Sequence, residues 1–73
     1  MSFDLPQAGP VTIRIYDVAG RRVKGFSGEG TVGVNMIHWD GRNDEGGHAS
    51  SGIYYYKLTT ADGQATRKMA LVK

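Results

Sequence analysis

The amino-acid sequence predicts a small all-β domain, and three observations lead to that fold class. Short segments alternate apolar and polar residues with period two, and Gly, Asn, Asp and Pro residues separate these segments. No segment has the period of an amphipathic helix. The chain has 73 residues, of which 40% are hydrophobic, which suits one core and a single domain, residues 1–73. A sandwich or a barrel of short strands is therefore expected.

The first strands are expected at residues 2–5, 11–16 and 22–26. Residues 2–5 alternate up to Pro6, which is typical of a short edge strand. Residues 11–16 have the clearest alternation in the chain, with β-branched residues on the inward face. Residues 17–21 contain a glycine that allows a tight turn, so residues 22–26 are expected to return as the second strand of a hairpin.

The middle of the chain combines a glycine-rich passage, a strand and a long loop. Residues 25–33 are expected to lead, as a loop, into a strand at 34–39. Ile37 and Trp39 share one face of this strand, and Trp39 is expected to be the large central packing residue. Turn-forming residues fill positions 41–52, which are therefore expected to form a loop.

The last two strands are expected at 53–60 and 65–72, joined by a turn that contains Asp62-Gly63. Period two places Tyr54 and Tyr56 on the face of Leu58, which makes all three core candidates. Tyr55 points to the opposite face with Ile53.

Composition excludes several classes of function. The chain has no cysteine, which rules out disulfides, thiolate metal sites and cysteine nucleophiles. The net charge is +2, with the two signs interspersed except at the cationic C-terminus, so no nucleic-acid partner is expected. No apolar run is long enough for a transmembrane helix.

The loop at residues 40–47 contains weak metal-binding candidates, Asp40, Asn43 and Asp44. Their oxygens could surround a hard cation such as Ca²⁺. Arg42, however, occupies a position that should supply a ligand, and Asp side chains in such loops also accept backbone N–H groups to shape a turn. The second interpretation is favoured, and no metal or other cofactor is expected.

The remaining polar and aromatic residues bear on catalysis and on glycan binding. His48 lies near Ser50 in sequence, but the flexible loop provides neither a third orienting group nor oxyanion donors, so no enzymatic activity is expected. His38 alternates with its neighbours and is expected to face solvent. Tyr55 offers one exposed ring for stacking on a sugar, which keeps a carbohydrate-binding or spacer module of an extracellular hydrolase as an alternative.

The C-terminal segment 65–73 supports two interpretations that composition alone does not separate. It is either a final strand that ends at a charged terminus, or an accessible peptide that a receptor could hold by its backbone and its lysines.

A family resemblance rests on motifs distributed over almost the whole chain: Phe3-Asp4-Leu5-Pro6, Val11-Thr12-Ile13-Arg14-Ile15-Tyr16-Asp17, Gly20-Arg21, Trp39-Asp40-Gly41, Ser51-Gly52-Ile53-Tyr54-Tyr55-Tyr56 and Lys68-Met69-Ala70-Leu71-Val72-Lys73. In this order and spacing they resemble the C-terminal sorting domain of type IX secretion substrates and its relative, the immunoglobulin-like domain of the flagellar hook-capping protein.

The resemblance implies a small immunoglobulin-like antiparallel β-sandwich of about seven strands. It also implies a non-catalytic C-terminal module that directs an attached cargo protein across the outer membrane of a Gram-negative bacterium, via the periplasm, to the cell surface or the medium. The implied partners are the outer-membrane secretion machinery, a sortase-like peptidase and the cargo. A structural assembly domain of a flagellar-type surface complex is the alternative within the same resemblance.

Residue roles follow from the same resemblance. The implied recognition element for the translocon is the last strand, with Lys68, Met69, Leu71, Val72 and Lys73. Structural roles are expected for Trp39, Asp40, Gly41, Gly52, Tyr54 and Leu58.

Overall fold

The structure is a computed structural model that describes residues 1–72, and this part of the chain contains six β-strands. In chain order the strands are β1 (Ser2–Leu5), β2 (Gly9–Tyr16), β3 (Arg22–Gly30), β4 (Gly33–Met36), β5 (Gly52–Thr60) and β6 (Gly63–Leu71). All strand pairs are antiparallel. The all-β prediction is confirmed. The count of about seven strands that the resemblance implies is not confirmed, since the described residues form six; residues 37–51 contribute an isolated bridge between Arg42 and His48.

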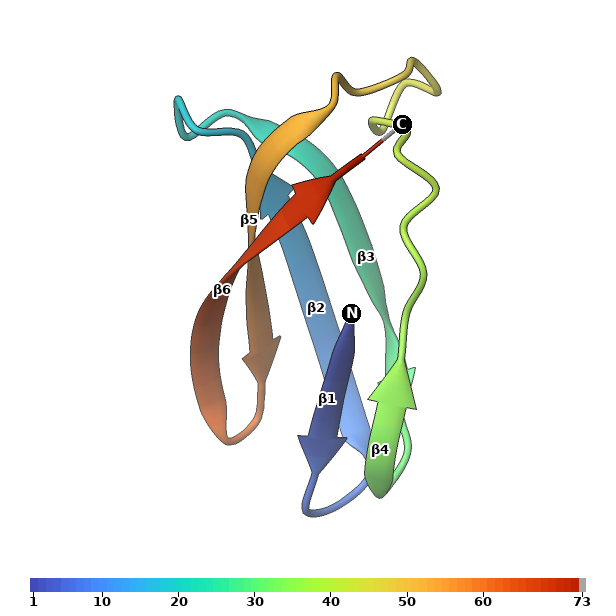
Figure 1. Ribbon diagram of the computed structural model, residues 1–73. Helices are drawn as coiled ribbons and strands as arrows, with labels where there is room; N and C mark the ends of the chain where they lie inside the picture. Colours follow the sequence, from blue (N-terminus) through green and yellow to red (C-terminus); the bar gives the residue numbers. More distant parts are fainter. Residues whose placement is uncertain (73) are drawn as a thin grey trace.

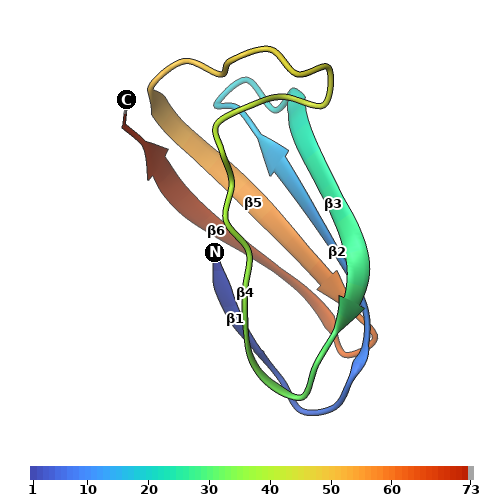
Figure 2. The ribbon, with the colours of Figure 1, turned by 90° about the vertical axis from the view of Figure 1, so that its right-hand side faces the viewer.

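The strands form two sheets that pack face to face. One sheet has two strands, in the order β1-β4, and the other has four, in the order β3-β2-β5-β6. Figure 1 shows the small sheet lying in front of the lower half of the large one. The segment after β4 rises along the same side to the top of β5, which Figure 2 shows from a second direction. The large sheet therefore has one covered face, called here the inner face, and one outer face that is turned away from β1 and β4.

The core lies on the inner face of β2. Val11, Ile13 and Ile15 alternate with exposed or half-buried residues, and both isoleucines are fully buried. β2 pairs with β3 on one side and with β5 on the other, so its inward side chains meet residues from both neighbours. Burial of one such side chain stabilises the fold by about 1.5–3 kcal/mol. The strongest alternation in the sequence thus marks the central strand.

The arrangement of β5 agrees with its sequence pattern. Tyr54 and Tyr56 are buried, and Leu58 is partly buried and packs against the same core. Ile53 and Tyr55 lie on the outer face and are exposed by 42% and 39%. The predictions for these side chains are confirmed.

β3 is longer than predicted, because the passage that was expected to be a glycine-rich loop continues the strand to Gly30. Gly30 is buried, and a Cβ atom there would overlap Leu5 Cδ1 and lie 2.9 Å from Val11 Cγ2. A glycine at this position therefore lets the end of β3 approach the small sheet.

β4 is shorter than predicted and ends at Met36, three residues before Trp39. Its partner β1 begins at Ser2, which pairs with Met36. One further pair of hydrogen bonds joins Met1 and Ile37, at 2.7 and 2.8 Å, and residues 37–41 form no strand. Ile37 and Trp39 remain half-buried on the inward side, and His38 is exposed as expected.

None of the described segments is a helix with the length and hydropathy needed to span a bilayer.

Candidate functional site

The predicted site residues occupy two regions of the domain. One is the upper end in Figure 1, where residues 39–51 form a long loop, called here the upper loop, beside the turn between β2 and β3. The other is β6, the last strand, which lies at one edge of the large sheet.

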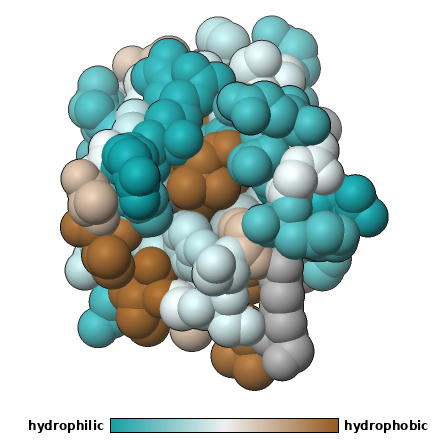
Figure 3. Space-filling model, turned by 90° about the horizontal axis from the view of Figure 1, so that it is seen from above, coloured by the Kyte–Doolittle hydropathy of each residue, from teal (hydrophilic) through white to brown (hydrophobic). Residues whose placement is uncertain are grey.

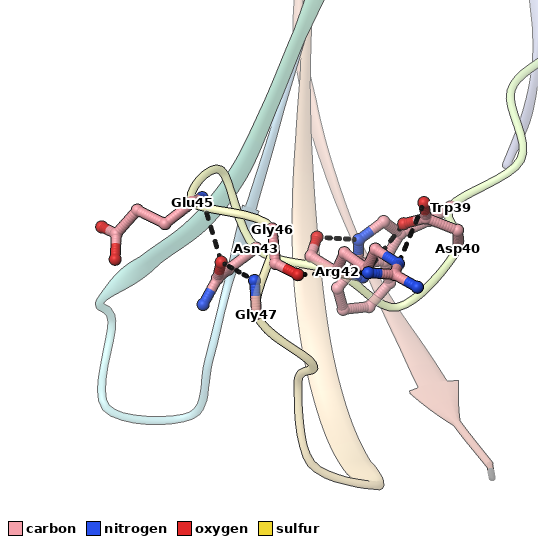
Figure 4. Close-up of polar contacts among 7 residues, drawn as sticks. All are labelled: Trp39, Asp40, Arg42, Asn43, Glu45, Gly46 and Gly47. Atoms are coloured by element: carbon pink, nitrogen blue, oxygen red, sulfur yellow. Dashed lines mark hydrogen bonds and ion pairs between the residues drawn. The ribbon is translucent and has the colours of Figure 1, made fainter.

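The loop at residues 40–47 is held together by hydrogen bonds to its own backbone (Figure 4). Asn43 Oδ1 accepts the N–H groups of Glu45 and Gly47, at 3.0 and 2.9 Å. The Asn43 backbone closes the same turn, because its N–H donates to Gly47 O and its carbonyl accepts from Gly46 N. Asn43 therefore shapes the turn with both its side chain and its main chain.

Asp40 and Arg42 form the other half of this loop. Asp40 Oδ1 accepts the Arg42 N–H at 3.0 Å, and Asp40 Oδ2 lies 3.9 Å from Arg42 Nε. Arg42 Nη1 also reaches Gly46 O at 3.3 Å (Figure 4). The position that interrupted the metal-ligand spacing is thus occupied by a cation that pairs with Asp40 and spans the loop.

Asp44 anchors the loop to the edge of β3. Its Oδ1 accepts the Gly25 N–H at 3.0 Å, and its own N–H donates to Val23 O at 3.0 Å. Its second carboxylate oxygen lies 3.5 Å from Arg22 Nε. Asp44 therefore continues the hydrogen bonding at the upper part of the β3 edge, where no strand pairs.

The three metal candidates do not converge. Asp40 and Asn43 bind backbone N–H groups inside the loop, and Asp44 is directed to β3. In residues 1–72 no three His, Asp or Glu side chains gather in a way that could hold a metal ion. The arrangement fits the turn-shaping role that was the favoured interpretation of these side chains.

Trp39 and Tyr54 join the loop to the core. Their rings meet edge to face, with centroids 5.2 Å apart and planes at 74°. Trp39 Nε1 donates to Arg42 O at 2.8 Å, and the Tyr54 hydroxyl donates to Ser50 O at 2.7 Å. Trp39 is half-buried at the end of the sandwich, so its expected position at the centre of the core is wrong. It packs against the core from the side and attaches the loop to it.

Gly41 makes this attachment possible. It is buried and has φ of +79°, a conformation that residues with a side chain rarely adopt. Its carbonyl accepts the Ala49 N–H at 2.7 Å, which closes the loop between Trp39 and Tyr54. The Trp-Asp-Gly and Ser-Gly-x-Tyr motifs, which lie apart in the sequence, are therefore parts of one structural unit.

The turn between β2 and β3 adds a charged group at the same end. Asp17 Oδ1 accepts the N–H groups of Ala19 and Arg21, at 3.0 and 2.9 Å, and Asp17 Oδ2 lies 3.1 Å from Arg21 Nε. The backbone hydrogen bond from Arg21, together with the charge of Arg21, lowers the pKa of Asp17 below its ordinary value of 3.8. The turn is thus tied together by an ionised carboxylate.

Seen from above, this end of the molecule is largely hydrophilic, with a few hydrophobic residues between the polar ones and along one side (Figure 3). A hollow of about 660 Å³ opens here, and His48 and Ser50 both line it. Within the described chain no hydrogen bond joins His48 to Ser50, and the Ser50 carbonyl accepts the Tyr54 hydroxyl. The nucleophile–base contact that hydrolysis requires is not formed by this pair.

β6 divides the predicted recognition residues between two faces. Met69 and Leu71 are half-buried and pack against the core, whereas Lys68 and Val72 are exposed, Val72 by 87%. Lys73 lies outside the described residues. β6 pairs only with β5 among the described strands, so the other edge of its nine residues is open. Lys68 and Val72 are therefore the predicted recognition side chains that a partner could contact.

Two cations that the sequence patterns did not single out lie next to Tyr55 on the outer face. The register pairs Arg14 directly with Lys57, and Tyr16 directly with Tyr55. Charges that are interspersed along the sequence are thus brought together across strands. The period-two pattern of residues 11–16 and 53–60 indicates on which face each cation lies. Which residues lie opposite each other follows only from the register between the two strands.

The fold and the loop contacts define a small antiparallel β-sandwich module in which a Trp-Asp-Gly turn docks on a tyrosine of an inner strand. This chain belongs to the FlgD Ig-like domain family, whose model matches residues 1–64. The flagellar half of the sequence resemblance is thereby confirmed. The match ends before Lys68, so it does not cover the predicted recognition residues. Neither the curated proteins nor the solved structures gave a significant match.

Proposed function

We propose that this domain is a non-catalytic structural module that takes part in assembling a flagellar-type surface complex. The observation that carries the proposal is the match of the FlgD Ig-like model to residues 1–64, which include the first five strands and the whole upper loop. Sorting was the leading expectation from the sequence and assembly was one of its alternatives, and the family match favours assembly.

The contacts of the loop support a scaffolding role. Asp17, Asp40, Asn43 and Asp44 all use side-chain oxygens to fix backbone N–H groups. Asp17, Asp40 and Asn43 stabilise turns, and Asp44 holds the loop to the edge of β3. These contacts hold the upper end of the domain in one conformation, as a scaffold requires.

Domain replacement in a flagellated bacterium tests the proposal. The immunoglobulin-like domain of the resident hook-capping protein is exchanged for residues 1–73, and hook formation is scored by electron microscopy and by motility. Hooks are expected with the exchanged domain and not with a variant in which the domain is deleted. If the chimera accumulates with a folded domain and still forms no hooks, the proposal is wrong.

Type IX sorting is a second candidate, and the open edge of β6 with exposed Lys68 and Val72 supports it. In this proposal the outer-membrane secretion machinery would bind the terminal strand of a folded domain, and the attached cargo would reach the surface or medium. A sortase-like peptidase would then act on the exported protein.

A reporter fusion separates the two candidates. Residues 1–73 are placed behind a signal peptide and a fluorescent protein in a type IX-competent bacterium. Sorting predicts surface or medium fluorescence that is lost in Lys68→Ser with Val72→Ser, because these two side chains are exposed and available to the secretion machinery. Periplasmic retention of the unmodified fusion would exclude sorting by this domain alone and leave the assembly proposal intact.

A further inference from the structure

The outer face of the large sheet concentrates positive charge. The adjacent strands β2, β5 and β6 contain the cations Arg14, Lys57, Arg67 and Lys68, and none of the seven acidic residues of the chain lies on these strands. Alternation directs Arg67 to the inner side with Tyr56 and places the other three on the outer face. On the outer face the charges of β2, β5 and β6 are therefore all positive, and the one carboxylate that the register places on this face is Glu29 of β3, opposite Pro10.

The register arranges these cations around two aromatic rings. Arg14 lies directly opposite Lys57. One row further along, Tyr16 lies opposite Tyr55, and Tyr55 lies opposite Lys68. Directly opposed residues in an antiparallel pair have Cβ atoms about 4.5–5.5 Å apart. The three cations and two tyrosines therefore form one continuous patch, named here the cation–tyrosine face.

No carboxylate compensates this patch within residues 1–72. Arg22, at the β3 border of the patch, is paired with Asp44 at 3.5 Å, whereas no ion pair is formed by Arg14, Lys57 or Lys68. Like charges directly opposite each other on a sheet are destabilising. The Arg14–Lys57 pair is therefore unfavourable in the isolated domain and becomes favourable when an anionic group is placed between the two side chains.

A depression on the same face fits such a group. The Arg22 guanidinium lies over Gly25, in the space that a side chain there would take, and a hollow of about 240 Å³ beside it is lined by Thr12, Arg14, Arg22 and Ser27 among others. The side chains at this hollow thus include two guanidinium groups, of which that of Arg22 is paired with Asp44, and two hydroxyls. Guanidinium groups bind carboxylates through paired hydrogen bonds.

We propose that the cation–tyrosine face is the docking surface of this domain for an acidic surface of a protein partner. This inference rests on the proposed assembly function and adds that the partner presents an acidic protein surface. Arg and Tyr are enriched at protein interfaces, and the two rings add apolar contact area between the charges. A second copy of this chain is a poor occupant, since two cationic faces repel each other. The few separated cations also lack the continuous basic track that follows a nucleic-acid backbone.

Binding of a synthetic polyglutamate peptide, followed by the NMR shifts of backbone amides, tests the proposal. Shifts are expected in β2, β5 and β6. The double variant Arg14→Gln/Lys57→Gln should weaken binding roughly tenfold, because it removes two half-exposed ion pairs between the domain and glutamate side chains of the peptide. The matched control is Arg21→Gln/Arg42→Gln, which removes the same total charge at arginines already paired with Asp17 and Asp40.

Several outcomes would overturn the proposal. Equal weakening in both double variants would show that only net charge matters. Shifts confined to other strands would place binding elsewhere. Tighter binding of a heparin fragment or an oligonucleotide to the same face would assign the face to a different class of partner. If the Arg14→Gln/Lys57→Gln variant does not fold, Lys68→Gln on the open edge is used in its place and should weaken binding by itself.

The domain-replacement strain distinguishes failure of this inference from failure of the assembly proposal. If the unmodified domain supports hook formation, the Arg14→Gln/Lys57→Gln domain should not, and the Arg21→Gln/Arg42→Gln domain should. Hooks formed equally well by all three domains would overturn the docking surface and leave the assembly function standing. Absence of hooks with the unmodified domain would overturn the assembly function, whatever the peptide result.

Discussion

Removal of Trp39 in two steps should separate its hydrogen bond from its packing. In Trp39→Phe the ring stays against Tyr54, but the bond from Nε1 to Arg42 O, 2.8 Å long, is lost. The Arg42 carbonyl lies at the surface and can bind water, so the loss should be about 1 kcal/mol. For a domain of this size that corresponds to a melting temperature lower by about 4–8 °C.

In Trp39→Ala the edge-to-face contact with Tyr54, at 5.2 Å, is lost as well. Such a pair contributes about 0.5–1.5 kcal/mol, and loss of a half-buried ring removes about another 1 kcal/mol of apolar burial. The total loss should be about 3 kcal/mol. A chain of this length has a stability of roughly 4–11 kcal/mol, so the variant should still fold.

The assay is thermal and urea unfolding followed by far-UV circular dichroism, because Trp39 is the only tryptophan and its fluorescence disappears in both variants. His38→Ala, at the exposed neighbouring position, is the control and should leave stability within about 0.5 kcal/mol. If Trp39→Ala costs no more than this control, Trp39 does not attach the upper loop to the sandwich.

Three further substitutions test the structure. Gly30→Ala should cost about 1–3 kcal/mol because its methyl group enters occupied space, whereas Gly28→Ala on the same strand, with no atom within 4 Å of its Cβ, should not; equal losses would contradict the close packing. Tyr54→Phe removes the hydroxyl that donates to Ser50 O at 2.7 Å, so the free energy of unfolding measured in urea should fall by about 1 kcal/mol; an unchanged urea curve would contradict this role. Asp17 has a folded-state pKa below 3.8, so its contribution to stability is complete above that pH and is lost as the pH falls through the folded-state pKa. The melting temperature of Asp17→Asn should therefore lie below that of the unmodified protein at pH 7 and converge with it in acid; a constant difference down to low pH would refute the assignment.

The parts of the fold that the sequence predicted are those where one face of a strand is buried. Val11, Ile13 and Ile15 show period two because every second residue enters the core, and the same holds for Tyr54 and Tyr56. A pattern of this kind is local, so it can be recognised without knowledge of the neighbouring strands.

The wrong predictions concern segments whose structure depends on residues far away in the sequence. Gly30 was predicted to lie in a glycine-rich loop, but it is the last residue of β3. A glycine is needed there because Leu5 and Val11 occupy the space that a side chain would take. The strand at 34–39 was expected to reach Trp39, but β4 ends at Met36, which pairs with Ser2 of β1. Neither cause is visible in the local sequence.

In the candidate site, too, some features follow from the local sequence and others depend on residues far away in the chain. The turn-forming role of Asp40 and Asn43 follows from residue type and is seen in the structure. The pairing of Arg14 with Lys57 depends on the register between β2 and β5, which joins residues 43 positions apart. Alternation indicates the face on which each cation lies, but not which cation it meets.

The small β1–β4 sheet also has a consequence for the order in which the domain folds. The turns between β2 and β3 and between β5 and β6 connect neighbouring strands, whereas the pairing of Ser2 with Met36 joins residues 34 positions apart. The chain between Ser2 and Met36 must close into a loop, at a cost in entropy, before the contacts of the small sheet can stabilise the fold. We expect the two hairpins of the large sheet to form early and the small sheet to dock late. In the native state the small sheet should then open first, so that amide hydrogens of β1 and β4 exchange with solvent before those of β2.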